Sequence, residues 1–300
     1  MTPGRQHCRL LGVVSRRAEA APEEDLVREV HVKDELGLEG EPALVVGGGY
    51  GIGRATALLL AKAGARVAVA DLVAERAKAV AEEVGGHAIV GDVTNEAGAR
   101  AVVDEAHAAL GGLTRLANIV GRTAMKPFLE TTSEEWEDDL RLNLLQQMYV
   151  CHAAGRHMRK TGGAIALVAS VSGIHGARRH VAYGVAKAGV LSLARALADE
   201  WGPYGIRVNT VSPDVNATPR HVEARSGTVE EILAAWDAKA ASEGVPLRRG
   251  GRAEEIAGPL VFLLSNMSSF VSGQAIVVDG GTMAHFPHQM GPDDRYTEAR

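Results

Sequence analysis

Short apolar runs and stretches of helical spacing alternate along the chain from residue 43 onward. The runs that we expect to form strands are Ala43–Val46, Arg66–Ala70, His87–Val90, Leu113–Ile119, Ala164–Ala169, Ile206–Val211 and Gln274–Val278. Helices are expected at Ala55–Gly64, Val73–Val84, Glu96–Leu110, Ser133–Met158 and Ala182–Trp201. Buried strands that alternate with helices form parallel sheets that helices cover on both faces. The pattern therefore predicts an α/β fold with a single doubly wound parallel sheet.

Two segments depart from this alternation. Residues 1–40 join a basic stretch to an acidic one, and we expect a flexible or loosely docked extension, or else a helix that packs on a neighbouring subunit. Residues 218–245 are polar and too long for a tight connection. They predict a helical flap over an active site, with a plain surface excursion as the alternative. The catalytic domain is then expected to span 41–283, followed by a tail at 284–300.

The composition narrows the class of protein. Of 300 residues, 46% are apolar, 23% are charged and 4% are aromatic, which is the balance of an ordinary soluble globule. A net charge of −5 does not favour binding to the phosphates of a nucleic acid. The two cysteines, Cys8 and Cys151, are too few for a disulfide framework, and no apolar run is long enough to cross a bilayer. We expect a cytoplasmic enzyme that uses no metal, membrane or nucleic acid.

A glycine-rich turn joins the first expected strand to the first helix. It reads Gly47-Gly-Gly-Tyr-Gly-Ile-Gly53. Glycines at such a turn let the backbone approach a pyrophosphate, whose charge then lies at the helix N-terminus. The spacing differs from the common dinucleotide fingerprint, and a merely flexible turn is the alternative. Together with the alternating pattern, the turn predicts a nucleotide-binding sheet of the Rossmann type.

The end of the second strand indicates which nucleotide binds. Asp71 lies there, 18 residues after Gly53, where a carboxylate accepts hydrogen bonds from an adenosine ribose and repels a 2′-phosphate. Leu72 brings no positive charge to this place, whereas Arg54 and Arg66 argue for a phosphate. We therefore expect NAD, with NADP as the less favoured cofactor.

Two later strand ends fit the same ligand, because ligands of open α/β sheets bind at the carboxyl ends of the strands. Asp92 and Val93 end the third strand, where they can contact an adenine. Asn118-Ile-Val-Gly121 ends the fourth, where the chain must pass close to the cofactor. These positions reinforce the nucleotide site that the glycine turn predicts.

Three residues further along the chain suggest proton chemistry. Tyr183 and Lys187 are four residues apart on an expected helix, so their side chains share one face. A neighbouring ammonium lowers the pKa of a phenol from its ordinary value near 10 and makes tyrosine an acid or base near neutral pH. Ser170 ends the strand before that helix, and its hydroxyl can hold a substrate oxygen. Each residue alone is more often structural, and the ordered set carries the prediction.

With these residues in place, the chain from about Leu36 to Thr282 resembles a classical short-chain dehydrogenase/reductase. The glycine turn, Asp71, the Asp92-Val93 pair and Asn118–Gly121 appear in the order and spacing of that family. The later positions that also match are Asn143, Ser170, Tyr183, Lys187, Arg207-Val-Asn209, Pro213, Thr218 and Asp279-Gly-Gly281.

The resemblance implies a catalytic tetrad of Asn143, Ser170, Tyr183 and Lys187. Tyr183 would exchange the proton of the alcohol or carbonyl, and Ser170 would orient that oxygen. Lys187 would bind the nicotinamide ribose and lower the tyrosine pKa, and Asn143 would hold a water that links Lys187 to solvent. Hydride transfer between the nicotinamide and the substrate carbon is the chemistry of the cofactor. The family also implies a homotetramer, or a homodimer.

The full set of expected cofactor contacts combines the residue-based and family-based arguments. It consists of Gly47, Tyr50, Gly51, Ile52, Gly53, Asp71, Leu72, Asp92, Val93, Asn118, Gly121, Tyr183, Lys187, Pro213, Asn216 and Thr218.

Four positions depart from the family pattern. Val46 stands where a threonine is usual before the first glycine, and Ile119-Val120 replaces the middle two residues of an Asn-Asn-Ala-Gly turn. Ala169 replaces the first serine of a pair, and Asp214 follows Pro213 where a glycine is usual. None of the four removes a member of the tetrad, so we expect activity, with an effect of the Asp214 carboxylate on the cofactor loop.

The substrate is the least determined part. Ser172, His175 and His180 lie on the segment between Ser170 and Tyr183 that should border the substrate, and Trp236 lies in the expected flap. We expect an NAD(H)-dependent oxidoreductase acting on a secondary alcohol or ketone. The alternatives are an NADPH-dependent ketone or 3-oxoacyl reductase and, in another class, a catalytically silent nucleotide-binding scaffold.

Overall fold

The computed structural model of the chain describes residues 36–123, 125–214, 216–217 and 228–284. The expectations for residues 1–35, for Thr218, for the first part of the flap and for the tail 285–300 therefore lie outside the described residues. Of Asn216 the structure gives only the backbone, which pairs with Gly251.

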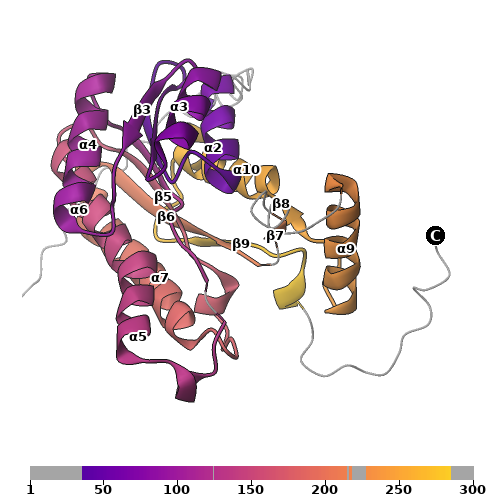
Figure 1. Cartoon of the computed structure of the whole chain (residues 1–300). Coiled ribbons are helices and arrows are strands. Elements are labelled where there is room, and N and C mark those ends of the chain that lie inside the picture. Colours follow the sequence, from indigo (N-terminus) through magenta and orange to yellow (C-terminus); the bar gives the residue numbers. More distant parts are fainter. Residues whose placement is uncertain (1–35, 124, 215, 218–227, 285–300) are drawn as a thin grey trace, which may run out of the picture. The chain divides into compact units, whose positions relative to one another are not determined.

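Seven parallel strands form one sheet in the order β3-β2-β1-β4-β5-β6-β9 (Figure 1). Their bounds are β1 Pro42–Val46, β2 Arg66–Asp71, β3 His87–Val90, β4 Arg115–Asn118, β5 Gly163–Val168, β6 Ile206–Pro213 and β9 Ala275–Val278. Two further short strands, β7 (Asn216–Ala217) and β8 (Gly251–Arg252), pair only with each other. The order turns back on itself between β1 and β4, so the predicted doubly wound sheet is confirmed.

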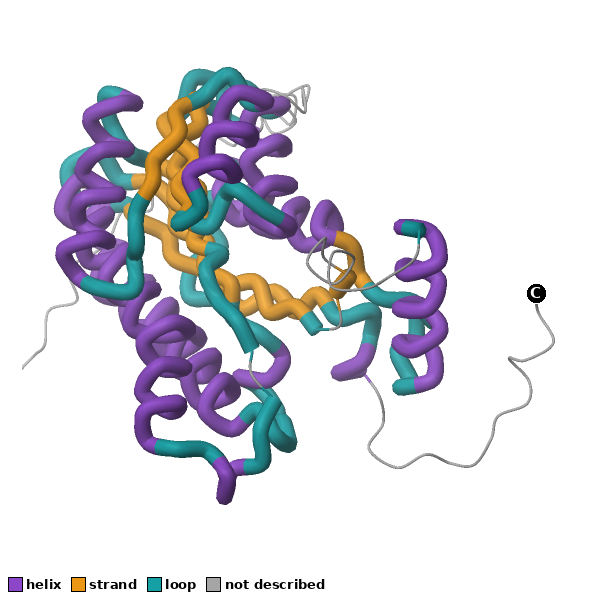
Figure 2. The backbone as a smooth tube through the Cα atoms, viewed as in Figure 1, coloured by secondary structure: helices purple, strands orange, loops and turns teal. Residues whose placement is uncertain are grey.

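Helices cover both faces of the sheet (Figures 1 and 2). Because side chains alternate along a strand, Leu44 and Val46 of β1 join one buried cluster and Ala43 and Val45 join the other. The first cluster includes residues of α4 (Glu96–Leu110), α6 (Gln146–Met158) and α7 (Val181–Trp201). The second includes residues of α2 (Gly51–Lys62), α3 (Ala74–Glu83) and α10 (Ala253–Leu264).

The long helix expected at Ser133–Met158 is interrupted. It consists of α5 (Ser133–Leu140), a π-helical turn at Arg141–Leu145, and α6. A π-turn of this kind commonly marks a functional position, and here it holds the fully buried Asn143. Hydrophobic spacing did not reveal the interruption, because the apolar positions continue through it.

Helix α10 was not among the predicted elements. It contains Pro259, which in a sequence argues against a helix interior, and it packs along α2. Burial of Ile256, Leu260 and Leu264, each 0% exposed, explains why the helix forms despite the proline.

The described part of the expected flap is the helix α9 (Val229–Ser242). It begins with a capping box between Thr228 and Glu231. Asp237 on this helix forms an ion pair with Arg252, with 2.7 Å between Oδ2 and the guanidinium nitrogen, and Gly250 donates its N–H to the same carboxylate. These contacts tie α9 to the segment that precedes α10.

One described helical segment, Val181–Tyr204, is long and apolar enough by length and composition to cross a membrane. In this structure it begins with α7, which packs against β6 and α5. The core helix of a water-soluble protein meets the same criterion.

Candidate active site

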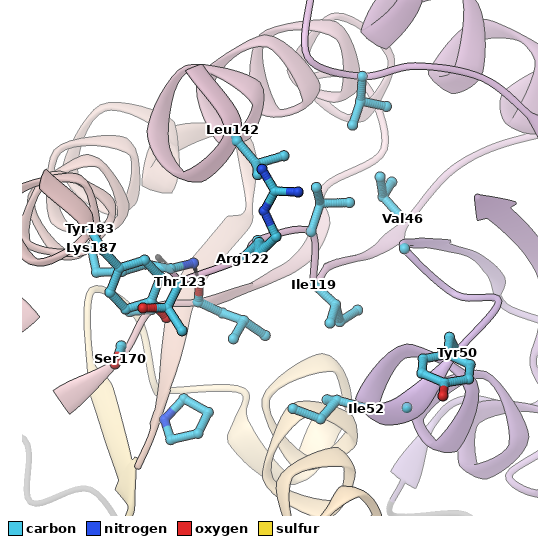
Figure 3. A pocket seen from close by; sticks show the side chains of 18 of the residues that line it. Val46, Tyr50, Ile52, Ile119, Arg122, Thr123, Leu142, Ser170, Tyr183 and Lys187 are labelled. Atoms are coloured by element: carbon cyan, nitrogen blue, oxygen red, sulfur yellow. Dashed lines mark hydrogen bonds between the residues drawn. The ribbon is translucent and has the colours of Figure 1, made fainter. Parts of the chain in front are cut away.

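A cavity of about 780 Å³ lies at the carboxyl ends of the strands. Val46, Asp71 and Ile119 line it where β1, β2 and β4 end, and Val168 and Pro213 line it at the ends of β5 and β6. Figure 3 shows Tyr50 and Ile52 toward one end, Ser170, Tyr183 and Lys187 toward the other, and Arg122 between them. The cavity is therefore continuous from the glycine turn to the expected catalytic side chains.

The glycine turn leaves no space for side chains at two positions. Gly47 has a φ of 77°, in the left-handed region that favours glycine. A Cβ on Gly53 would overlap the backbone carbonyl of Gly47, so α2 approaches the turn at backbone distance. Gly47, Gly51 and Ile52 line the cavity, and the first turn of α2 holds no acidic residue. This helix end presents N–H groups to the cavity without a competing carboxylate.

Asp71 lies beside the turn, at the far end of the cavity from Tyr183. Its Oδ2 accepts the N–H of Gly49 at 3.1 Å and its Oδ1 accepts the N–H of Val73 at 3.0 Å. These two hydrogen bonds fix the carboxylate at the cavity wall, next to Leu72, Asp92 and Val93.

The arginines that argued for a 2′-phosphate are engaged elsewhere. Arg54 pairs with Glu83 at 2.6 Å, and Arg66 donates to the carbonyl of Gly40. A third arginine, Arg76, lies over the Tyr50 ring with its Cζ 4.5 Å from the centroid. Among the described residues that line the cavity, none of these three arginines is found.

The opposite end of the cavity holds Ser170, Tyr183 and Lys187 together. Lys187 is 1% exposed, donates from Nζ to the Val168 carbonyl at 2.8 Å, and has Nζ 5.6 Å from the centroid of the Tyr183 ring. Ser170 is 8% exposed, and its Oγ accepts the N–H of Ser172 at 3.1 Å. The hydroxyl comes from the segment that follows β5, and the phenol and the amine come from one face of α7, as the spacing predicts.

The acid–base balance of this group differs from the expected one. Burial raises the pKa of Tyr183, a hydrogen bond with Ser170 opposes that rise, and the negative charge of Asp139 adds to it. Burial also lowers the pKa of Lys187 to about 7. The tyrosine pKa is thus raised rather than lowered in this structure, because desolvation of the phenolate outweighs the hydrogen bond with Ser170.

Asn143 and Asn118 lie behind the cavity wall. Asn143 donates from Nδ2 to the Arg122 carbonyl at 2.9 Å, and its Oδ1 accepts the Arg122 N–H at 2.9 Å. Asn118 donates to Gln146 at 3.0 Å, and Gln146 donates to the Val120 carbonyl at 2.9 Å. Neither asparagine lines the cavity; both hold the chain that follows β4, so the structure places Asn118 as a support of the wall.

Gly121 forms the point where that wall meets the catalytic side chains. A Cβ on Gly121 would lie 2.9 Å from Oδ1 of Asn143 and 3.1 Å from Nζ of Lys187. A larger residue at this position would push the amine away, which accounts for a glycine in the altered Asn118–Gly121 turn.

The four substrate candidates divide into two groups. Ser172, His180 and Trp236 line the main cavity, whereas His175 is exposed and lines only a neighbouring cavity of about 420 Å³. Asp214 lines the main cavity as well. His175 is thus separated from the other candidates.

Residue-level reasoning missed several lining residues. Arg122, Thr123 and Met125 follow Gly121 directly and line the cavity, as does Leu142 from the π-turn. Lys239 lines it beside Trp236, with Nζ 5.2 Å from the indole centroid. The helical spacing of three between Trp236 and Lys239 was the signal that could have identified the latter. No three His, Cys, Asp or Glu of the described residues are grouped so as to hold a metal ion.

Comparisons with known proteins agree with this geometry. The family model described as Enoyl-(Acyl carrier protein) reductase matches residues 47–283. D-threitol dehydrogenase of Mycolicibacterium smegmatis is 35% identical over 260 residues, which cover 85% of this chain and 97% of that protein. The 3-oxoacyl-(acyl-carrier-protein) reductase of Aquifex aeolicus is 34% identical over 254 residues, covering 82% and 99%.

A solved structure resembles the fold over a similar extent. The structure of a 7α-hydroxysteroid dehydrogenase complexed with NADH and 7-oxo glycochenodeoxycholic acid has a TM-score of 0.74 and 31% identity, and the match covers 83% of this chain and 96% of that one. The sheet, the glycine turn and these matches have one consequence: this chain belongs to the short-chain dehydrogenase/reductase family and is an oxidoreductase.

Proposed function

We propose that this oxidoreductase is NAD(H)-dependent and moves a hydride between the nicotinamide and the carbon of a secondary alcohol or ketone. The observation that carries the proposal is the single cavity that joins the Gly47–Gly53 turn and Asp71 to Ser170, Tyr183 and Lys187. Its volume of about 780 Å³ lies in the upper part of the range for small-molecule sites. Relatives named as dehydrogenases of an alcohol and a structure with bound NADH support it.

The residues present fit a dinucleotide. The tight packing of Gly47 against Gly53 brings backbone N–H groups to the place of the pyrophosphate, and the start of α2 favours its charge. Asp71 would accept the ribose hydroxyls of the adenosine, and Lys187 would contact the ribose of the nicotinamide. The bound nicotinamide supplies the hydride acceptor or donor.

Within this proposal, Tyr183 transfers the proton at the reacting oxygen. A raised pKa keeps its phenol protonated at neutral pH, which is the form that donates a proton to a carbonyl oxygen during reduction. In alcohol oxidation the phenolate must form first, so we expect oxidation to speed up toward alkaline pH. Ser170 holds the same oxygen by hydrogen bonding, and its place beside Tyr183 in the cavity supports that role.

Asn143 acts as a positioning residue in this account. Its two hydrogen bonds to the backbone of Arg122 hold Gly121 against the Lys187 amine. This contact supports a role of Asn143 that is exerted through Lys187. The family resemblance implies a related role, in which Asn143 holds a water that links Lys187 to solvent.

Asp71 supports NAD over NADP, because its carboxylate lies where a 2′-phosphate would be repelled. Arg76 lies beside Tyr50 in the glycine turn. Its positive charge favours the second candidate, an NADPH-dependent ketone or 3-oxoacyl reductase, and a relative is named as a reductase of the latter kind. We further propose a cytoplasmic homotetramer or homodimer with a small-molecule substrate.

Replacement of Tyr183 by Phe tests the proposal directly. We expect turnover of secondary alcohols with NAD⁺ to fall by at least about 100-fold, since general acid–base catalysis contributes about 10²–10⁴-fold, while NADH binding changes little. The exposed Tyr204 provides the matched control, and Tyr204→Phe should retain full activity. Retained turnover in Tyr183→Phe would refute the mechanism, and turnover of no alcohol or ketone by the unaltered protein would favour the silent scaffold.

A further inference from the structure

His180 lies where the segment after β5 enters α7, at the N-cap of that helix. It lines the main cavity together with Ser172 and Tyr183, and it also lines the neighbouring cavity. Its ring stands edge-on to the Tyr183 ring, with 6.2 Å between the centroids. The imidazole therefore forms part of the wall next to the proposed acid–base residue.

One ring nitrogen of His180 has an unmet hydrogen bond. Nε2 is buried and has no hydrogen-bonding partner among the residues that the structure describes. Buried polar atoms are almost always paired, and an exception calls for a reason such as a ligand. The reacting oxygen is already assigned to Ser170 and Tyr183, so a group that pairs with His180 must be a second polar group.

The backbone holds His180 firmly in this position. The preceding residue, Arg179, has a φ of 69°, which is uncommon for a residue other than glycine and is typical of functional segments. The Arg179 carbonyl accepts the N–H of Lys126 at 2.8 Å, and the His180 carbonyl accepts the N–H of Gly184 at 2.7 Å. The backbone at His180 is thus held between the segment after β4 and the first turn of α7.

The surroundings of His180 keep its ring neutral. Burial lowers its pKa, the carboxylate of Asp139 opposes that effect, and Arg179 adds to it. A neutral imidazole offers one donor and one acceptor nitrogen. Such a ring can donate to or accept from an uncharged hydroxyl or carbonyl group, and it brings no positive charge that would favour a carboxylate or a phosphate.

We propose that His180 determines specificity by binding a second oxygen of the substrate, on the carbon next to the reacting one, so that the preferred substrate is a vicinal diol or an α-hydroxyketone. This inference rests on the proposed function and adds a substrate class to it. His180 caps α7 and Tyr183 lies in the first turn of that helix, and their two rings meet edge-on with 6.2 Å between the centroids. A substrate oxygen at Tyr183 therefore places an adjacent oxygen beside His180.

Paired substrates test the assignment. The unaltered enzyme is assayed for NAD⁺ reduction with 2,3-butanediol and with 2-butanol, which differ by the second hydroxyl. We expect the kcat/KM for the diol to exceed that for the mono-alcohol by about 10- to 100-fold, the size of one well-formed buried hydrogen bond. Loss of that hydroxyl should raise KM and lower kcat/KM, because the hydrogen bond to it lies away from the reacting carbon.

Variants of His180 then identify the partner. His180→Leu should lower kcat/KM for the diol by about 10- to 100-fold and change that for 2-butanol by less than about 3-fold. His180→Gln, which restores a donor and an acceptor, should recover much of the preference. His175→Leu, in the same segment but outside the main cavity, should leave both substrates unchanged. NADH binding and circular dichroism establish that each variant is folded.

The outcomes separate this inference from the proposed function. Equal activity of the unaltered enzyme on both alcohols, or equal losses on both in the His180 variants, would overturn the role of His180 and leave the proposed function standing. If a panel of secondary alcohols and ketones that includes these two pairs gave no turnover with NAD(H) or NADP(H), the proposed function would fail, and the inference with it.

Discussion

The buried amine of Lys187 has a measurable effect on stability. Its pKa falls from 10.5 to about 7 because the side chain is wholly removed from water. A shift of one pKa unit corresponds to about 1.4 kcal/mol. The site therefore destabilises a fully charged ammonium by about 5 kcal/mol relative to the unfolded chain. At pH 7, where the folded protein carries about half the charge, the cost is about 4 kcal/mol.

Replacement of Lys187 by Met removes this cost but also removes the hydrogen bond to the Val168 carbonyl. That bond to a charged donor is worth about 1.5–3 kcal/mol. We therefore expect Lys187→Met to be inactive, yet to unfold with a free energy about 1–3 kcal/mol higher than the unaltered protein at pH 7. Urea unfolding, followed by circular dichroism at a fixed protein concentration without cofactor, measures the difference.

The pH dependence gives the sharper test. Between pH 7 and 10.5 the unfolded chain binds more protons at this site than the folded protein, so the stability of the unaltered protein rises with pH in that window. The advantage of Lys187→Met should shrink by about 3 kcal/mol from pH 7 to pH 10. The exposed Lys160 supplies the control, and Lys160→Met should show no such trend. A difference that stayed constant or grew with pH would refute the reasoning.

Three further predictions concern the cofactor and α9. A Cβ at Gly53 would overlap backbone, so Gly53→Ala should weaken NADH binding at least about 10-fold and cost about 1–3 kcal/mol of stability; unchanged binding in a fluorescence titration would contradict the packed turn. Asp71→Ala combined with Leu72→Arg should shift the NADPH-to-NADH affinity ratio toward NADPH by about 10-fold or more, and an unchanged ratio would remove Asp71 from its role. Asp237→Asn breaks the ion pair with Arg252 and should raise KM several-fold in steady-state assays with kcat nearly unchanged; an unaltered KM would show that this tether does not support the substrate site.

Much of the fold was predictable because its signals are local. Each strand of the seven-stranded sheet is a short apolar run and begins and ends within two residues of the expected bounds, whereas the short strands β7 and β8 were not expected. The helix α10 was missed because Pro259 argues against a helix interior, and only its packing on α2 outweighs that local preference. The π-turn at Arg141–Leu145 was missed because it leaves the apolar spacing intact.

The candidate site was predictable in part for the same reason. Tyr183 and Lys187 share a helix face because they are four residues apart. The glycine turn follows the carboxyl end of its strand, at the same edge of the sheet. The topology therefore brings the turn and the two side chains to one cavity. The contribution of Arg122 to the cavity depends on how distant segments pack, which no local pattern records. The direction of the tyrosine pKa depends on burial, and burial is a property of the folded chain alone.

Titration of the purified protein with NADH and with NADPH, followed by nicotinamide fluorescence, tests the central claim most directly. The account predicts saturable NADH binding with a Kd at least about 10-fold below that of NADPH, because Asp71 stands at the place of the 2′-phosphate. Tighter binding of NADPH, or binding of neither nucleotide, would contradict it.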